Sequence, residues 1–241
     1  MSSLVDISTP TQIDTLALIQ RIRDYEPALV KIIFDFVFVL CSEDQEGKHK
    51  YIRAIPKPGT KTISDEAFND NRTLEWVIID DSVETIGNKA FYECSNLSNV
   101  TIGNSVETIG DCAFNSCSNL SNMNIPNSVE TIGYGAFYKC SSLTHVNIPN
   151  LVETIDTSAF GWCSSLISVT IGNSVDNIKL CAFNGCSSLR TITIPNSVKT
   201  IGDCAFRGCS SLREVSIPKH LEKQVKDNKV FPEHTKIIVR Q

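Results

Sequence analysis

The sequence predicts a repeat solenoid of mostly β content, because three apolar residues recur along it with one fixed period. A phenylalanine recurs every 23 residues, an isoleucine keeps step five residues before it, and a leucine keeps step six residues after it. A fixed period of roughly 20–50 residues is the signature of stacked repeats, in which each coil buries its apolar side chains against its neighbours. The periodic phenylalanines are Phe68, Phe91, Phe114, Phe137, Phe160, Phe183 and Phe206.

Each repeat contains the residues needed for one coil. In the copy over 104–126, Met123 and Ile125 alternate inward, whereas Asn122 and Asn124 point outward, which is typical of a strand. A proline or a glycine follows each such strand and ends it. The motif Val-x-x-Ile-Gly forms the second side, and Ala-Phe-x-x-Cys is too short for more than one helical turn. We expect about seven to eight coils with a parallel β-sheet on one face.

The chain divides into three segments by this pattern. The repeats occupy residues 57–218, and residues 1–56 and 219–241 stand outside them. The end coils of a solenoid would otherwise leave apolar side chains and strand edges in water, so we expect both flanking segments to be caps.

The N-terminal cap is expected to contain a helix and strands. Ser8 and Pro10 favour a helix start, and isoleucines and leucines recur at helical spacing after them. Residues 28–41 are compatible with helix or strand, but their Ile, Phe and Val content favours a strand, with a return strand over 51–55. At the other end, the stretch 235–239 indicates a last strand.

Charge and targeting signals exclude some functions. The net charge is −5 and no run of Lys or Arg occurs, so we expect no nucleic-acid partner. The most apolar window, 28–41, carries Lys31 and Asp35 and is too short to span a bilayer. The first residues lack the basic region of a secretory signal, which favours a cytoplasmic location, or a secreted or surface one if the native N-terminus is missing. We expect a monomer.

The cysteines follow the period too. Three precede the Ala-Phe motif (Cys112, Cys181 and Cys204), and Cys41 stands alone. Cysteines in a ladder are spaced closely enough for disulfides, but their Cβ vectors should point the same way. We expect small, buried, reduced side chains, and neither zinc nor any other cofactor, because no Cys-x-x-Cys pair occurs. The six cysteines on the period are Cys94, Cys117, Cys140, Cys163, Cys186 and Cys209.

The repeat resembles the BspA-type leucine-rich repeat. The copy over 127–149 reads Asn-Ser-Val-Glu-Thr-Ile-Gly-Tyr-Gly-Ala-Phe-Tyr-Lys-Cys-Ser-Ser-Leu-Thr-His-Val-Asn-Ile-Pro, and residues 80–218 keep this pattern with few departures. The resemblance implies a curved, right-handed, leucine-rich-repeat-like solenoid with strands on one face. It also implies a role as a protein-interaction module or as a surface adhesin.

Functional residues are expected where outward positions differ between coils, since the invariant positions hold the fold. Trp76 and Ile78 on the strand face are candidate anchors for a partner, although the N-terminal cap could instead cover them. His145 is the other large group on this face and could also be a plain surface residue. The strand row, defined as one outward position of successive strands, is Trp76, Asn99, Asn122, His145, Ser168, Thr191 and Glu214.

A second outward position is acidic in five successive coils. This acidic row could bind a basic partner or a divalent cation, or it could be a solvated face copied with the repeat. Its members are Glu84, Glu107, Glu130, Glu153 and Asp176.

No catalytic arrangement is predicted. The four histidines are dispersed, no nucleophile has a partner at a defensible spacing, and the glycines are single and periodic. Aromatic residues beside the Phe turn, Tyr92, Tyr138 and Trp162, could form a patch or be scattered. The sequence therefore predicts a non-catalytic protein-interaction module that binds through its strand face, with an adhesin-like surface protein as the alternative.

Overall fold

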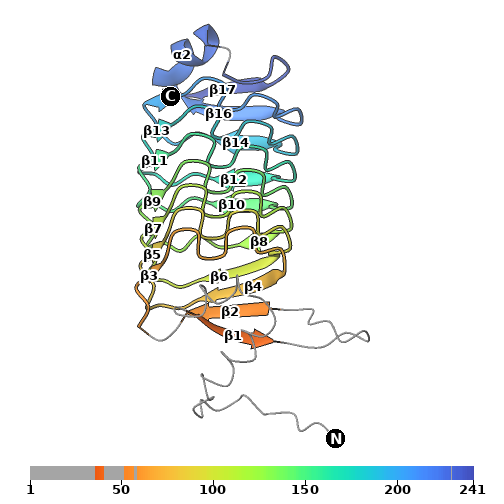
Figure 1. The fold of residues 1–241 in the computed structure, drawn as a ribbon. Coiled ribbons are helices and arrows are strands. Elements are labelled where there is room, and N and C mark those ends of the chain that lie inside the picture. The colour runs from red at the N-terminus through yellow and green to blue at the C-terminus, as the bar shows by residue number, and fades with distance from the viewer. Residues whose placement is uncertain (1–35, 41–51, 57–58, 229) are drawn as a thin grey trace, which may run out of the picture.

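The computed structural model describes residues 36–40, 52–56, 59–228 and 230–241, and these form a stack of coils (Figure 1). The architecture is a parallel β-solenoid of about eight coils with little helix, which confirms the predicted fold class. The expected N-terminal helix lies outside the described residues.

One side of the solenoid is a face of parallel strands in register. Residues that are paired across neighbouring strands differ by 23 in number, as in Trp76↔Asn99 and His145↔Ser168. The period of the sequence is therefore the length of one coil. The strands are β4 (Leu74–Ile79), β6 (Asn99–Ile102), β8 (Asn122–Met123), β10 (His145–Asn147), β12 (Ser168–Thr170), β14 (Thr191–Thr193) and β16 (Glu214–Pro218).

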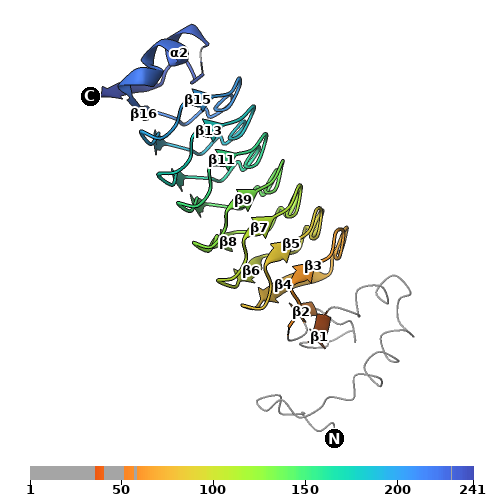
Figure 2. The same cartoon turned by 90° about the vertical axis from the view of Figure 1, so that its left-hand side faces the viewer.

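The other side carries a second parallel ladder of two-residue strands, each an outward Thr or Asn followed by a buried Ile. Figure 2 shows the two sets of strands on separate sides of the coils. The sequence predicts a second side here but not a sheet, because two residues are too few to show strand alternation. These strands are β3 (Thr62–Ile63), β5 (Thr85–Ile86), β7 (Thr108–Ile109), β9 (Thr131–Ile132), β11 (Thr154–Ile155), β13 (Asn177–Ile178) and β15 (Thr200–Ile201).

The Phe-containing turn connects the coils by a third set of hydrogen bonds. Two residues in each turn have positive φ, such as Lys89 at 52° and Glu93 at 57°. This conformation costs energy in non-glycine residues, and here it turns alternate peptide N–H groups toward the next coil. The N–H groups of Lys89, Phe91 and Glu93 all donate to carbonyls of the following coil, at 2.7–2.8 Å.

The periodic phenylalanines form one continuous stack inside the solenoid. Neighbouring rings lie 5.0–5.5 Å apart between centroids and are within 12° of parallel from Phe68 to Phe206. All seven are fully buried. Each of these rings therefore buries its surface against the rings of the neighbouring repeats.

The six periodic cysteines are buried beside the stack and are all reduced, as expected. Each thiol donates a hydrogen bond to the carbonyl of the phenylalanine 26 residues earlier; Cys140 Sγ, for example, lies 3.1 Å from the Phe114 oxygen. Burial raises the pKa of Cys94 and of Cys163 to about 12. Cys94 and Cys163 are therefore structural donors and poor nucleophiles, because only the thiolate reacts.

Both ends of the stack carry additional elements. β1 (Phe36–Leu40) pairs antiparallel with β2 (Ile52–Pro56), so the ambiguous stretch is a strand over its described residues. At the C-terminus, β17 (Lys236–Arg240) pairs with β16, which confirms the expected last strand.

The C-terminal cap also contains helix that the sequence did not predict, in η2 (Lys219–Leu221) and α2 (Glu222–Asp227). A hydrogen bond from Lys219 and another from Lys226 lower the pKa of Glu222 to about 2. Phe231 is out of step by two residues, yet its ring lies 4.9 Å from that of Phe206 and closes the stack. None of the helices in the described part of the chain is long and apolar enough to cross a membrane.

Candidate functional site

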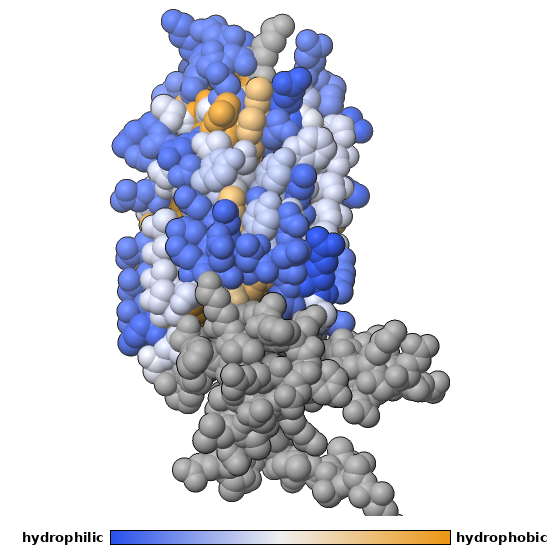
Figure 3. Space-filling view, viewed as in Figure 1, coloured by the Kyte–Doolittle hydropathy of each residue, from blue (hydrophilic) through white to orange (hydrophobic). Residues whose placement is uncertain are grey.

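The strand row follows the strand face in the order that the register dictates. Its exposed members are Trp76, His145, Ser168 and Thr191, and its half-buried members are Asn99 and Glu214. His145 is exposed on β10, and its Nδ1 lies 2.9 Å from Thr144 Oγ1. At the C-terminal end, Glu214 forms an ion pair of 3.6 Å with Lys236 of β17. The row thus runs from an aromatic group, through amides and hydroxyls, to a charged pair. Figure 3 shows that the face in view is mostly hydrophilic, with a few apolar side chains.

Trp76 is the large apolar group of this row, and 40 % of it is exposed. Ile78, two residues further along β4, is half-buried, so the two do not form an equally exposed pair as the sequence suggested. An exposed tryptophan on a rigid strand is a typical anchor of protein interfaces. On its N-terminal side β4 pairs with β2, where Arg53 stands opposite Trp76, and most of the N-terminal cap lies outside the described ranges.

The acidic row runs parallel to the second ladder, and lysines pair with both of its ends. Lys61 Nζ lies 2.5 Å from Glu84, and Lys199 Nζ lies 3.1 Å from Asp176. Both lysines occupy the position of the row in their own coils, 23 residues before and after. Among the described residues, the three middle members form no ion pair. These are Glu107, Glu130 and Glu153.

The carboxylates of the acidic row are not gathered as metal ligands. No group of three or more His, Cys, Asp or Glu side chains within the described ranges could hold a metal ion. One carboxylate in each coil gives a line of charges, which suits an extended basic surface better than a single cation.

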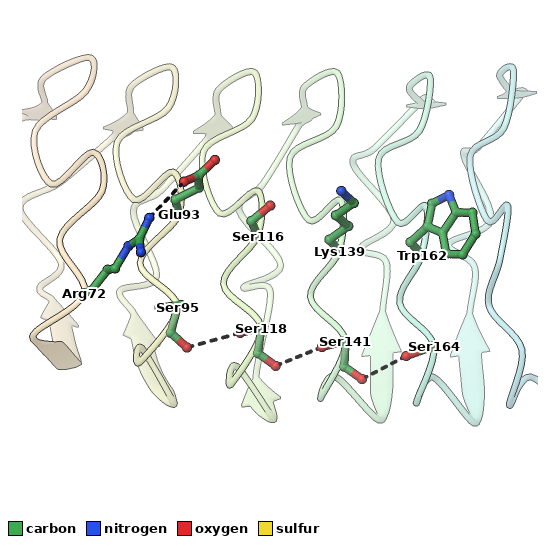
Figure 4. Close-up of a pocket in the computed structure, with 9 residues that line it drawn as sticks. All are labelled: Arg72, Glu93, Ser95, Ser116, Ser118, Lys139, Ser141, Trp162 and Ser164. Atoms are coloured by element: carbon green, nitrogen blue, oxygen red, sulfur yellow. Dashed lines mark hydrogen bonds and ion pairs between the residues drawn. The ribbon is translucent and has the colours of Figure 1, made fainter.

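A shallow groove of about 460 Å³ crosses several coils beside the Phe turn (Figure 4). Its floor is a ladder of serines in which each hydroxyl donates to the carbonyl of the serine one coil before, as Ser141 does to Ser118 at 3.2 Å. Arg72 and Glu93 form an ion pair of 3.6 Å at one end. Trp162, which is 53 % exposed, stands at the other.

The aromatic side chains of this turn are spread along it. Trp162 has a φ of 60°, and its indole lies against the next coil, where a Cβ on Gly185 would approach the ring to 3.0 Å. Lys139 lies 5.4 Å above the ring of Tyr138. Tyr92 is half-buried beside Glu93. The sequence left open whether these groups form a patch. Of the three aromatic residues, Trp162 is the one with a large exposed surface, so they do not form an exposed aromatic patch together.

Three apolar residues that the sequence analysis did not single out are exposed on the side of the second ladder. Tyr134 and Leu151 are each 51 % exposed, and Leu180 is 48 % exposed. The signal was present in the sequence, because each of them replaces a polar residue found at the same place in other coils.

The comparison with protein families decides the identity of the repeat. Six copies of the BspA type leucine rich repeat region match, over residues 61–189 and 131–237. The chain belongs to the BspA-type leucine-rich repeat family. Such repeats generally serve in protein interactions or on surfaces, and they are generally non-catalytic. No curated protein matches the chain.

Two solved structures resemble this BspA-type chain over most of its length. A leucine rich cell surface protein from Faecalibacterium prausnitzii is 31 % identical, with a TM-score of 0.64 over 76 % of this chain and 53 % of that one. The chain thus spans about half of that protein's structure. A leucine rich repeat protein from T. pallidum is 25 % identical, with a TM-score of 0.64 over 84 % of this chain and 97 % of that one.

Proposed function

We propose that this chain is a protein-interaction module that binds its partner through the strand face. The observation that carries the proposal is Trp76, an exposed indole held on β4 in a row whose other members are polar. Large aromatic side chains on rigid elements supply much of the affinity of interfaces, because they bury a large area and lose little conformational entropy.

The rest of the strand row supports recognition by polar contacts. His145, Asn99 and Thr191 differ from coil to coil, whereas the buried residues of the same strands are apolar throughout. A position that varies while its neighbours are fixed is under no structural demand to take one residue type. The row therefore offers a partner a distinct sequence of side chains at about 4.8 Å intervals.

The test replaces the candidate anchors by residues that the same positions hold in other coils. Trp76→Asn copies Asn99, and His145→Asn copies Asn122. Quantitative capture of binding proteins by the intact chain should fall for the double variant while its melting temperature stays constant. A matched control, Lys199→Gln on the other side of the coils, should bind as the unaltered chain does. Equal capture by all three proteins would refute a strand-face site.

A second candidate function is that of an adhesin-like repeat protein on the cell surface. The relative with 31 % identity is described as a cell surface protein, and this favours the surface alternative over the cytoplasmic location expected from the sequence. Protease treatment of intact cells that produce the native gene product distinguishes the two. Digestion of the protein supports the surface alternative, and protection of it supports an internal location.

A further inference from the structure

Two outward positions of the coils carry exposed apolar residues in the middle of the stack and polar residues elsewhere. The first lies three residues before each phenylalanine, and the second lies nine residues before it. The seven coils serve as an internal comparison, because their backbones are equivalent. At the first position the coils carry Asp65, Asn88, Asp111, Tyr134, Thr157, Leu180 and Asp203.

The usual residue at the first position has a structural role. Its side-chain oxygen accepts the backbone N–H of the same position in the next coil: Asp65 accepts from Asn88 at 2.7 Å, and Asp111 accepts from Tyr134 at 2.8 Å. A tyrosine in place of the acid removes the acceptor that Thr157 would use. Asp156 supplies it instead, since its Oδ1 lies 2.5 Å from the Thr157 nitrogen.

The replacement of Asp or Asn by Tyr134 is therefore offset by a second change. Asp156 stands where the three preceding coils have Gly87, Gly110 and Gly133. Asp156 is held in turn by Lys179, one coil further along, at 3.0 Å. The backbone N–H of Thr157 thus keeps an acceptor, but the acceptor is a different side chain from the one in the regular coils. The number of these hydrogen bonds does not rise, and the phenol ring of Tyr134 is exposed.

At the second position, too, an apolar residue replaces a side chain that forms a hydrogen bond to the neighbouring coil. Five of the seven coils have a serine there. Its hydroxyl donates to a carbonyl of the preceding coil in three of them; Ser128, for example, donates to the Val106 carbonyl at 2.6 Å, and Ser197 to that of Val175 at 2.7 Å. Leu151 takes this place in the central coil and cannot donate, and half of its surface is in water. Departures from local rules that bring no structural gain are expected at functional sites.

Of these apolar residues, Leu151 lies beside two carboxylates of the acidic row that form no ion pair among the described residues. Leu151, Glu130 and Glu153 line one hollow of about 530 Å³, together with Asp156 and Lys179. Lys179 also lines the neighbouring hollow, of about 510 Å³, which contains Leu180. Tyr134 adjoins this second hollow, because the N–H of its neighbour Gly135 donates to the carbonyl of Thr157 in the hollow's lining at 3.0 Å. We name this surface the acidic–apolar patch, and its members are Glu130, Tyr134, Leu151, Glu153 and Leu180.

We propose that the acidic–apolar patch binds a basic segment of a partner protein, with apolar side chains of that segment seated on Leu151, Leu180 and Tyr134. The partner must be cationic because Glu130 and Glu153 have no cation partner among the described residues. Charge complementarity also disfavours a second copy of the chain, whose own patch would bring like charges together, and an anionic lipid surface. This site is separate from the strand face and does not depend on the proposed function.

The test removes the patch by restoring the regular repeat. Leu151→Ser and Leu180→Asp each install the residue that other coils have, so the double variant should fold at least as well as the unaltered chain. Random linear peptides displayed on phage are selected on the intact protein. We expect selected peptides rich in Lys or Arg with interspersed Leu or Phe, and binding about tenfold weaker or more to the double variant.

Two further measurements separate charge from shape. Glu130→Gln with Glu153→Gln should weaken binding and reduce its dependence on salt between about 50 and 500 mM NaCl. Trp76→Asn on the strand face should leave binding unchanged. Selected peptides without cationic residues, no selected peptide at all, or equal binding to the double variant would overturn the proposal. A dimer of the chain that the double variant abolishes would also overturn it, in favour of self-association.

Discussion

Replacing Phe137 by alanine should destabilise the solenoid strongly, because its ring is fully buried between two others. The centroids of Phe114 and Phe160 lie 5.4 and 5.3 Å away, and the planes differ by only 4° and 11°. Deleting a buried phenylalanine ring costs about 3–5 kcal/mol from lost burial and the remaining cavity. For a chain of this length, such a loss corresponds to a fall in melting temperature of roughly 6–20 °C.

The assay is thermal unfolding followed by circular dichroism, with matched variants along the stack. Phe137→Leu keeps most of the apolar volume and should cost much less. The pair Phe137→Ala and Phe160→Ala should cost less together than the sum of the single losses, since they share one ring contact. An unchanged melting curve for Phe137→Ala, or strictly additive losses for the pair, would refute the stacked-ring account.

Three further predictions concern the contacts around the stack. Burial of Cys163 should make the fold sensitive to base: it raises the pKa of this thiol to about 12, whereas the pKa of an unfolded cysteine is about 8.5, so between these values only the unfolded state ionises and stability falls as the pH rises, by on the order of 1–2 kcal/mol at pH 10. Urea unfolding at pH 8 and pH 10 measures this fall, and Cys163→Val should reduce it; an equal fall without the thiol would contradict the assignment. Asp111→Ala removes the acceptor of the Tyr134 N–H and should cost about 0.5–1.5 kcal/mol, measured by urea unfolding against Asp111→Asn, which keeps an acceptor. Lys199→Gln breaks an exposed ion pair with Asp176 and should cost less than about 1 kcal/mol, and a larger loss in the same assay would show that the pair is structural.

Much of the fold could be predicted from the sequence because one period governs residues 57–218. The spacing of Phe68 to Phe206 determined the coil length, and the alternation around Met123 located the strand face, both as the structure has them. The Thr-Ile ladder was missed because a two-residue strand carries no alternation. The helix α2 was missed because its charged residues offer only Val225 as a fully buried position.

Less of the candidate sites could be predicted from the sequence, for a physical reason. The sequence places Glu130 and Trp76 outward but does not say which side chains share a hollow, since that depends on how positions far apart in one coil are brought together. The exposure of Ile78 was overestimated because alternation does not report what neighbours cover. Tyr134 and Leu151 could have been found from the sequence, by comparing every outward position between coils rather than the strand positions alone.

In our proposal, the departures from the repeat on the side of the second ladder form one binding surface. The most direct measurement is a map of backbone amide shifts by nuclear magnetic resonance while a selected basic peptide is added to the intact chain. We expect shifts that cluster around Leu151, Leu180 and Tyr134 and that disappear in the double variant Leu151→Ser with Leu180→Asp. Shifts that instead cluster on the strand face around Trp76, or that persist unchanged in the double variant, would contradict it.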